Sequence, residues 1–164
     1  MYQKLFALFA IVILAGSCSK KEDTPAPVEC TYNACAVVAP QAEIDAVKSY
    51  LDANSITATQ HCSGMFYKID VEGSGLAAKA CSVVAVTYEG KLTNGTVFDS
   101  RSTPLALSLQ QVIRGWTNGI PLIKAGGRIY LYIPPTLGYG ANANGPIPAN
   151  SILIFRVDLV AVQP

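Results

Sequence analysis

VVAVTYEGKLTNGTVFDS, residues 83–100, is the stretch of this sequence that decides the fold. From residue 83 to residue 89 the side chains alternate, with Val84, Val86 and Tyr88 on one face, which is typical of a strand buried on one side. The pair Asn94-Gly95 follows, and this dipeptide is a strong signal for a tight turn between two strands. We therefore expect an antiparallel hairpin here.

Further strands and helices are expected on both sides of this hairpin. Alternating or apolar runs bounded by Gly, Pro and Asn predict strands. A helix that ends before Pro121 is expected to carry Val112, Ile113 and Trp116 on one apolar face. The sum is an α+β domain with an antiparallel sheet. The expected strands are 65–69, 83–89, 105–109, 128–133 and 151–160, and the expected short helix is 110–120.

A separate helix is expected near the N-terminus, over residues 41–53. Ile44, Val47 and Leu51 recur there at helical spacing. Their apolar face could cover the main domain or bind a partner, and we favour the first.

The first residues have the form of an export signal. Lys4 precedes an uncharged apolar run, residues 5–15, which is too short to span a bilayer as a helix. The run ends in Leu-Ala-Gly-Ser-Cys at 14–18, which resembles a bacterial lipobox, so Cys18 is expected to carry lipid. The alternative is an ordinary signal peptide with Cys18 as a spare thiol. The expected parts are a signal peptide 1–17, a lipid-anchored tether 18–29, an N-terminal segment 30–61 and a main domain 62–164.

Four cysteines remain after Cys18, and an even number in an exported protein indicates two disulfides with three possible pairings. We predict Cys30–Cys35, because these residues are close in sequence, and Cys62–Cys81, because each precedes one of two successive strands. A metal site is the weaker interpretation, because the chain has one histidine and no Cys-x-x-Cys pair. No metal or cofactor is expected.

Composition excludes several classes of protein. The chain has 12 Lys and Arg against 11 Asp and Glu, and loss of Lys4 with the signal would leave no net charge. Binding to nucleic acid by bulk electrostatics is therefore not expected. Motifs for a nucleophilic serine, a phosphate loop or a zinc protease are absent from the sequence. An enzyme here must work without general acid–base or nucleophilic side chains.

Several motifs in turn-rich positions together resemble the FKBP-type peptidyl-prolyl cis-trans isomerases. They occur in family order over about residues 62–162. The motifs are VTYEGKL at 86–92, NGTVFDS at 94–100, QVIRGW at 111–116, GYG at 138–140, and GPIPAN at 145–150 leading to LIF at 153–155.

This resemblance implies a half-wrapped antiparallel sheet around a short helix, with an apolar pocket for a prolyl ring between them. Trp116 would form the pocket floor. Asp99 would orient groups in the pocket, and the Ile113 amide and Tyr139 hydroxyl would bind substrate carbonyls. Leu107 stands where the family commonly has phenylalanine. The implied site is Tyr88, Asp99 and Tyr139 as catalytic residues, and Phe98, Val112, Ile113, Trp116, Ile147 and Phe155 as substrate-binding residues.

The resemblance also implies an activity, which is isomerisation of Xaa-Pro bonds in exported proteins by a lipid-anchored envelope enzyme. The implied partners are proline-containing polypeptides, macrolide inhibitors and the membrane through the lipid anchor. We expect a monomer. The alternatives are a module that binds proline-containing segments without turnover, and an envelope lipoprotein that uses the fold only as a scaffold.

Overall fold

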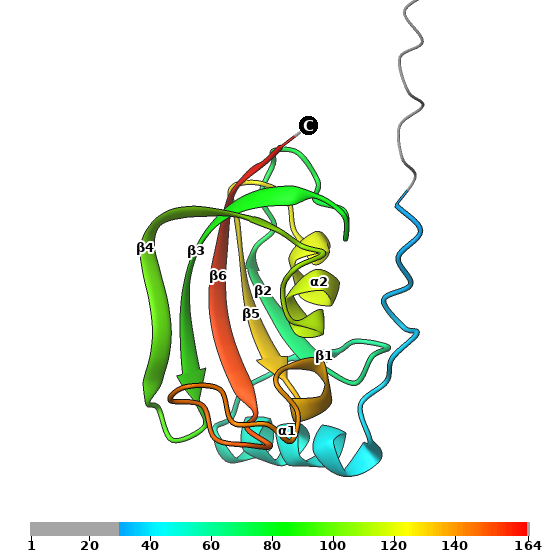
Figure 1. The fold of residues 1–164 in the computed structure, drawn as a ribbon, viewed down its shortest axis with the longest axis vertical. Helices are drawn as coiled ribbons and strands as arrows, with labels where there is room; N and C mark the ends of the chain where they lie inside the picture. Colours follow the sequence, from blue (N-terminus) through cyan, green and yellow to red (C-terminus); the bar gives the residue numbers. More distant parts are fainter. Residues whose placement is uncertain (1–29, 164) are drawn as a thin grey trace, which may run out of the picture.

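The computed structural model describes residues 30–163 and has the expected α+β architecture (Figure 1). The predicted signal peptide, the tether and Cys18 lie outside the described residues. No helix in the described part of the chain has the length and hydropathy to span a bilayer. The elements are α1 (Gln41–Ala53), β1 (Thr59–Gln60), β2 (Phe66–Val71), β3 (Val83–Leu92), β4 (Val97–Ser108), α2 (Arg114–Gly119), the 3-10 helix η1 (Ile120–Leu122), β5 (Gly127–Ile133), the 3-10 helix η2 (Pro135–Leu137) and β6 (Leu153–Val162).

All strand pairs in the sheet are antiparallel, in the order β1-β2-β5-β6-β3-β4. The last strand in the chain, β6, lies in the interior of the sheet between β5 and β3 (Figure 1). The two halves of the sheet are therefore joined only when the C-terminal strand is in place.

The predicted hairpin is confirmed. β3 and β4 meet at a turn in which Gly95 has a φ of 86° and donates its N–H to the Leu92 carbonyl. β4 differs from the prediction, because it runs unbroken from Val97 to Ser108 instead of starting near residue 105. Its register with β3 shifts where Pro104 lies. Proline is tolerated there because β4 is the edge strand and needs no second set of ladder hydrogen bonds.

The predicted helix 110–120 is wrong in its bounds. The α-helix covers only Arg114–Gly119, because Ile113 has an extended ψ of 147° and Gln111 donates its N–H to the Ser108 carbonyl in a turn. Val112 and Ile113 therefore lie on the segment that leads into the helix. Beyond Gly119 the chain continues as the 3-10 helix η1, which accommodates Pro121.

Two glycines let α2 lie directly on β5. A β-carbon at Gly115 would stand 2.5 Å from the Ile133 side chain, and one at Gly119 would stand 2.5 Å from Leu131. Real β-carbons do not approach other atoms so closely. Close contact between this helix and the sheet thus depends on glycine, which has no side chain, at positions 115 and 119. This contact brings Trp116 into the main core.

The predicted N-terminal helix is confirmed as α1, and its apolar face covers the domain instead of awaiting a partner. Ile44, Val47 and Leu51 are buried in a cluster with Phe66 and Tyr132. Along β5, Tyr132 alternates with residues that belong to the core beneath α2. Since alternate side chains point to opposite faces, α1 and α2 pack on opposite sides of the sheet.

Two disulfides are present, but the predicted pairing is wrong. The bridges are Cys30–Cys81 and Cys35–Cys62. The segment that contains Cys30 and Cys35 runs along the domain past α2 (Figure 1), where the Tyr32 hydroxyl donates a 2.7 Å hydrogen bond to Asn118. The fold therefore brings each cysteine next to a partner that is not the nearest of the four in sequence.

These bridges are expected to stabilise the domain by constraining the unfolded chain. They link residues 51 and 27 positions apart. Loop-closure entropy then predicts a loss in the free energy of unfolding of about 4 kcal/mol for Cys30→Ser/Cys81→Ser and about 3.5 kcal/mol for Cys35→Ser/Cys62→Ser. Urea unfolding measures both values. A peptide map in which Cys30 is joined to Cys35 would contradict the pairing.

Candidate functional site

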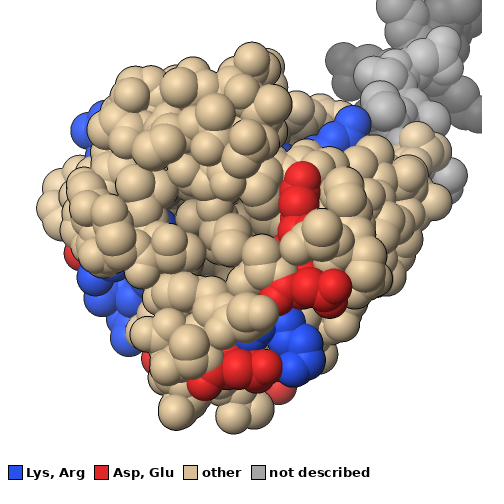
Figure 2. Space-filling model, turned by 90° about the horizontal axis from the view of Figure 1, so that it is seen from below, with Lys and Arg blue, Asp and Glu red and all other residues tan. Residues whose placement is uncertain are grey.

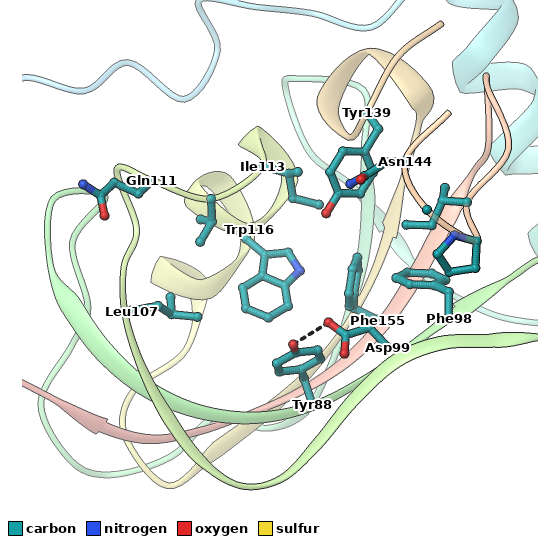
Figure 3. Close-up of a pocket in the computed structure, with 14 residues that line it drawn as sticks. Tyr88, Phe98, Asp99, Leu107, Gln111, Ile113, Trp116, Tyr139, Asn144 and Phe155 are labelled. Atoms are coloured by element: carbon teal, nitrogen blue, oxygen red, sulfur yellow. Dashed lines mark hydrogen bonds between the residues drawn. The ribbon is translucent and has the colours of Figure 1, made fainter. Parts of the chain in front are cut away.

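A cavity of about 570 Å³ opens between the sheet, α2 and the loop that follows β5 (Figure 3). All nine residues that the sequence implied for catalysis or substrate binding line it. Leu107, which stands where the related family commonly has phenylalanine, lines it as well. The complete lining is Tyr88, Phe98, Asp99, Leu107, Gln111, Val112, Ile113, Trp116, Tyr139, Asn144, Gly145, Pro146, Ile147 and Phe155.

Edge-to-face aromatic contacts build the floor of this pocket. The Trp116 ring meets Tyr88 at a centroid distance of 5.0 Å and Phe155 at 5.1 Å, with interplanar angles of 81° and 84°. Phe98 meets Phe155 in the same way, at 5.4 Å. Such geometry is favourable because the positive edge of one ring faces the negative face of the other.

The Trp116 indole nitrogen is buried and has no hydrogen-bond partner in the described part of the chain. Figure 3 shows this nitrogen on the side of the indole that faces Phe155. An aromatic face is a weak acceptor for an N–H group, which reduces the cost of burying the unpaired donor.

Gly90 makes room for these rings, and sequence reasoning did not assign it to the site. A β-carbon at this position would lie 2.7 Å from both the Phe98 and Phe155 rings. The available signal was a glycine inside a strand, which marks a close approach by another group.

The Tyr88 hydroxyl donates a 2.6 Å hydrogen bond to the carboxylate of Asp99 (Figure 3). In the pairing of β3 with β4, Asp99 lies opposite Gly90, which is two residues after Tyr88. This register brings the side chains of Tyr88 and Asp99 together. Burial, and after it the hydrogen bond to Asp99, raises the pKa of Tyr88 to about 12. The phenol therefore remains protonated and keeps donating at neutral pH.

Two polar groups lie above the aromatic floor. Within residues 30–163 the backbone N–H of Ile113 donates to no other group, because this residue precedes the first turn of α2. The Tyr139 hydroxyl points into the pocket on the side of Ile113 (Figure 3). These two groups can hydrogen-bond a ligand that rests on Trp116.

Gln111, Asn144, Gly145 and Pro146 also line the pocket and were not predicted as site residues. Asn144 and Ile147 exchange two backbone hydrogen bonds of 2.9 and 3.0 Å across a tight turn. This turn holds Ile147 at the pocket. Its Asn-Gly-Pro composition signalled a turn, but not its place in the fold.

Among residues 30–163 no three His, Cys, Asp or Glu side chains are placed to hold a metal ion. His61 lies in a loop, where its Nδ1 is 2.9 Å from the Ser63 hydroxyl and burial lowers its pKa.

Comparison with known proteins identifies similar chains. The family described as FKBP-type peptidyl-prolyl cis-trans isomerase matches residues 75–160. A probable FKBP-type isomerase of Haemophilus influenzae is 49% identical over 106 residues, covering 62% of this chain and 44% of that one. The isomerase FkpA of Aeromonas hydrophila is 39% identical over 136 residues, covering 75% and 50%. This chain therefore spans about half the length of these relatives.

A similar solved structure is that of FkpA from Escherichia coli. It superposes with a TM-score of 0.67 at 36% identity, over 76% of this chain and 64% of that one. The likeness in fold thus extends beyond the matched residues 75–160.

The raised pKa of Tyr88 predicts a loss of stability in alkali. The folded protein binds the phenol proton more tightly, with a pKa of about 12 against the ordinary value of 10.0. The resulting stabilisation is complete below pH 10 and is lost as the pH rises toward 12. We expect the free energy of unfolding to fall more steeply over this range in the wild type than in Tyr88→Phe. Parallel curves from urea titrations at each pH would contradict this.

Proposed function

The chain belongs to the family of FKBP-type peptidyl-prolyl cis-trans isomerases, and we propose that its pocket catalyses rotation about Xaa-Pro bonds. The observation that carries the proposal is the convergence of all nine implied residues on one aromatic pocket. They come from two strands of one hairpin, the start of α2, the loop after β5 and strand β6.

An apolar pocket suits this reaction because the reaction needs no acid, base or nucleophile. Rotation about the peptide bond is opposed by about 18–20 kcal/mol, because it breaks amide resonance. The planar amide has a polar oxygen that water stabilises, and a prolyl ring seated on Trp116 would lose part of that water. Contacts that are stronger to the twisted amide lower the barrier further, and each ~1.4 kcal/mol of such preference gives about tenfold in rate.

The polar groups have distinct roles in this proposal. The N–H of Ile113 and the hydroxyl of Tyr139 would donate to carbonyls on either side of the proline. Asp99 would accept the Tyr88 hydrogen bond, hold that ring against Trp116 and lie near the twisting amide. The supporting observations are the 2.6 Å bond and the direction of the Tyr139 hydroxyl (Figure 3).

Clients are proposed to be proline-containing segments that are recognised by shape and apolar contact. Asp99 is the one charged side chain among the pocket-lining residues. The face seen in Figure 2 is mostly uncharged, with its acidic side chains gathered toward one side. Bulk charge therefore gives little steering to a client, in line with a net charge of +1 for the whole chain.

We further propose that the protein works in the bacterial cell envelope as a lipid-anchored monomer. The lipobox-like sequence that ends in Cys18 and the two disulfides support export. Binding of macrolide inhibitors at the same pocket is part of this proposal.

Isomerase activity is tested by a protease-coupled assay on short Xaa-Pro peptides. Asp99→Ala should lower kcat/KM by about tenfold or more, because Tyr88 loses its acceptor. It should lower the free energy of unfolding only by the net worth of that hydrogen bond, about 0.5–1.5 kcal/mol, because the Asp99 side chain is otherwise exposed. Tyr139→Phe removes one hydrogen bond of about 0.5–1.5 kcal/mol and should cost about twofold to tenfold. Glu72→Ala, an exposed carboxylate outside the pocket lining, is the control.

Two results would overturn the proposed activity. Peptides that bind while isomerising at the uncatalysed rate would indicate a binding module that acts without turnover. Absence of both binding and turnover would indicate that the fold serves only as a scaffold.

Lipid attachment is tested by mass spectrometry of protein extracted from bacterial membranes. We expect a mature chain that begins at Cys18 with a lipid-modified N-terminus, because small residues precede this cysteine. Cys18→Ser should leave the protein in the soluble fraction. An unmodified wild-type chain that starts elsewhere would contradict the anchor.

A further inference from the structure

The carboxylate of Glu43 on α1 accepts two hydrogen bonds from Thr136, a residue 93 positions later in the chain. The Thr136 backbone N–H lies 2.8 Å from one oxygen, and its hydroxyl lies 2.8 Å from the other. Hydrogen bonds to an ionised acceptor are stronger than those between neutral groups. This contact therefore joins the first turn of α1 to the 3-10 helix η2.

Thr136 needs an acceptor from outside its own turn. Pro135 has no N–H, and Leu137 donates its N–H to the Pro134 carbonyl. Pro134, the residue before this short helix, makes no side-chain hydrogen bond to it. The N–H of Thr136 is therefore the one donor at the start of η2 that has no partner within the turn. Glu43 supplies the acceptor, and α1 is itself held in place by the buried Ile44.

The turn that Glu43 holds is the one that carries Tyr139. Both neighbours of this tyrosine, Gly138 and Gly140, donate their N–H groups to the carbonyl of Pro135 at 2.9 Å. The Pro135 carbonyl and the Thr136 N–H belong to one planar peptide unit, so the contact with Glu43 fixes the unit that contains this shared acceptor. Tyr139 is itself 37% exposed, which leaves its ring with little packing of its own.

We propose that Glu43 is a positioning residue of the pocket, which holds the 134–140 loop so that the Tyr139 hydroxyl stays over the aromatic floor. Glu43 lies outside the family-matched residues 75–160, so the N-terminal helix sets part of the site geometry. The effect on substrate rests on the proposed isomerase function, whereas the effect on the loop does not.

The test compares Glu43→Gln with Asp45→Asn, a carboxylate on the same helix that bonds only to Gln41 of that helix. The first readout is amide hydrogen exchange by NMR, which is independent of activity. Exchange at Gly138 and Gly140 should be faster in Glu43→Gln, because the neutral amide replaces two hydrogen bonds to a carboxylate by weaker neutral ones, its oxygen accepting from the Thr136 N–H and its amino group donating to the Thr136 hydroxyl. It should be unchanged in Asp45→Asn. Unchanged exchange in Glu43→Gln would overturn the inference.

The second readout is binding of an Xaa-Pro peptide, measured by fluorescence of Trp116, the single tryptophan of the chain. Glu43→Gln should raise the Kd and KM by about twofold to tenfold, no more than the loss of the Tyr139 hydrogen bond itself. In a Tyr139→Phe background the same change should have almost no further effect, since the two act on one contact.

Additive effects of the two substitutions on Kd, or a lower melting temperature with unchanged Kd, would show that Glu43 is merely structural and would overturn the inference. Faster glycine exchange in a protein that neither binds nor isomerises peptides would refute the proposed function while supporting the loop contact. The two failures are thus distinguishable.

Discussion

The Trp116 indole stands edge-on to Tyr88 on β3 and Phe155 on β6, and the rest of the molecule is arranged around this contact. The two rings come together only if β6 inserts next to β3 in the sheet. The indole reaches them only if α2 lies close to the sheet, which the missing side chain at Gly115 permits. The same packing that closes the core therefore leaves an aromatic surface open to a ligand.

Much of the sheet could be predicted from local pattern, because alternation at Val84, Val86 and Tyr88 and the Asn-Gly turn are local properties of the chain. The pocket residues were found through motifs, whereas their spacing along the chain does not reveal that they converge. The bounds of α2 were missed because Val112, Ile113 and Trp116 have helical spacing. The extended ψ of Ile113 is set by the turn before it, which no periodicity reports.

Contacts between distant residues were the least predictable part. Cys30 is five positions from Cys35 in the sequence, whereas in the fold it lies beside Cys81, 51 positions away, and bonds to it. For Glu43, the sequence indicates only a place in the first turn of a helix, where an acidic residue complements the helix dipole. Its role at Thr136 has no local signature, because both partners are ordinary surface residues until the fold joins them.

The nested bridges have a consequence for how the protein matures. Among the four bridged cysteines, Cys30 and Cys35 come first in the chain, so an oxidant that joins these cysteines in order of their arrival would couple them to each other. Neither native bridge contains that pair, since one joins Cys30 to Cys81 and the other joins Cys35 to Cys62. Correct maturation therefore requires either that Cys30 and Cys35 stay unpaired until their partners at 62 and 81 have arrived, or that a thiolate reopens the early bridge and exchanges it. A protein proposed to help others fold would then itself depend on the timing of oxidation or on a disulfide-reshuffling catalyst.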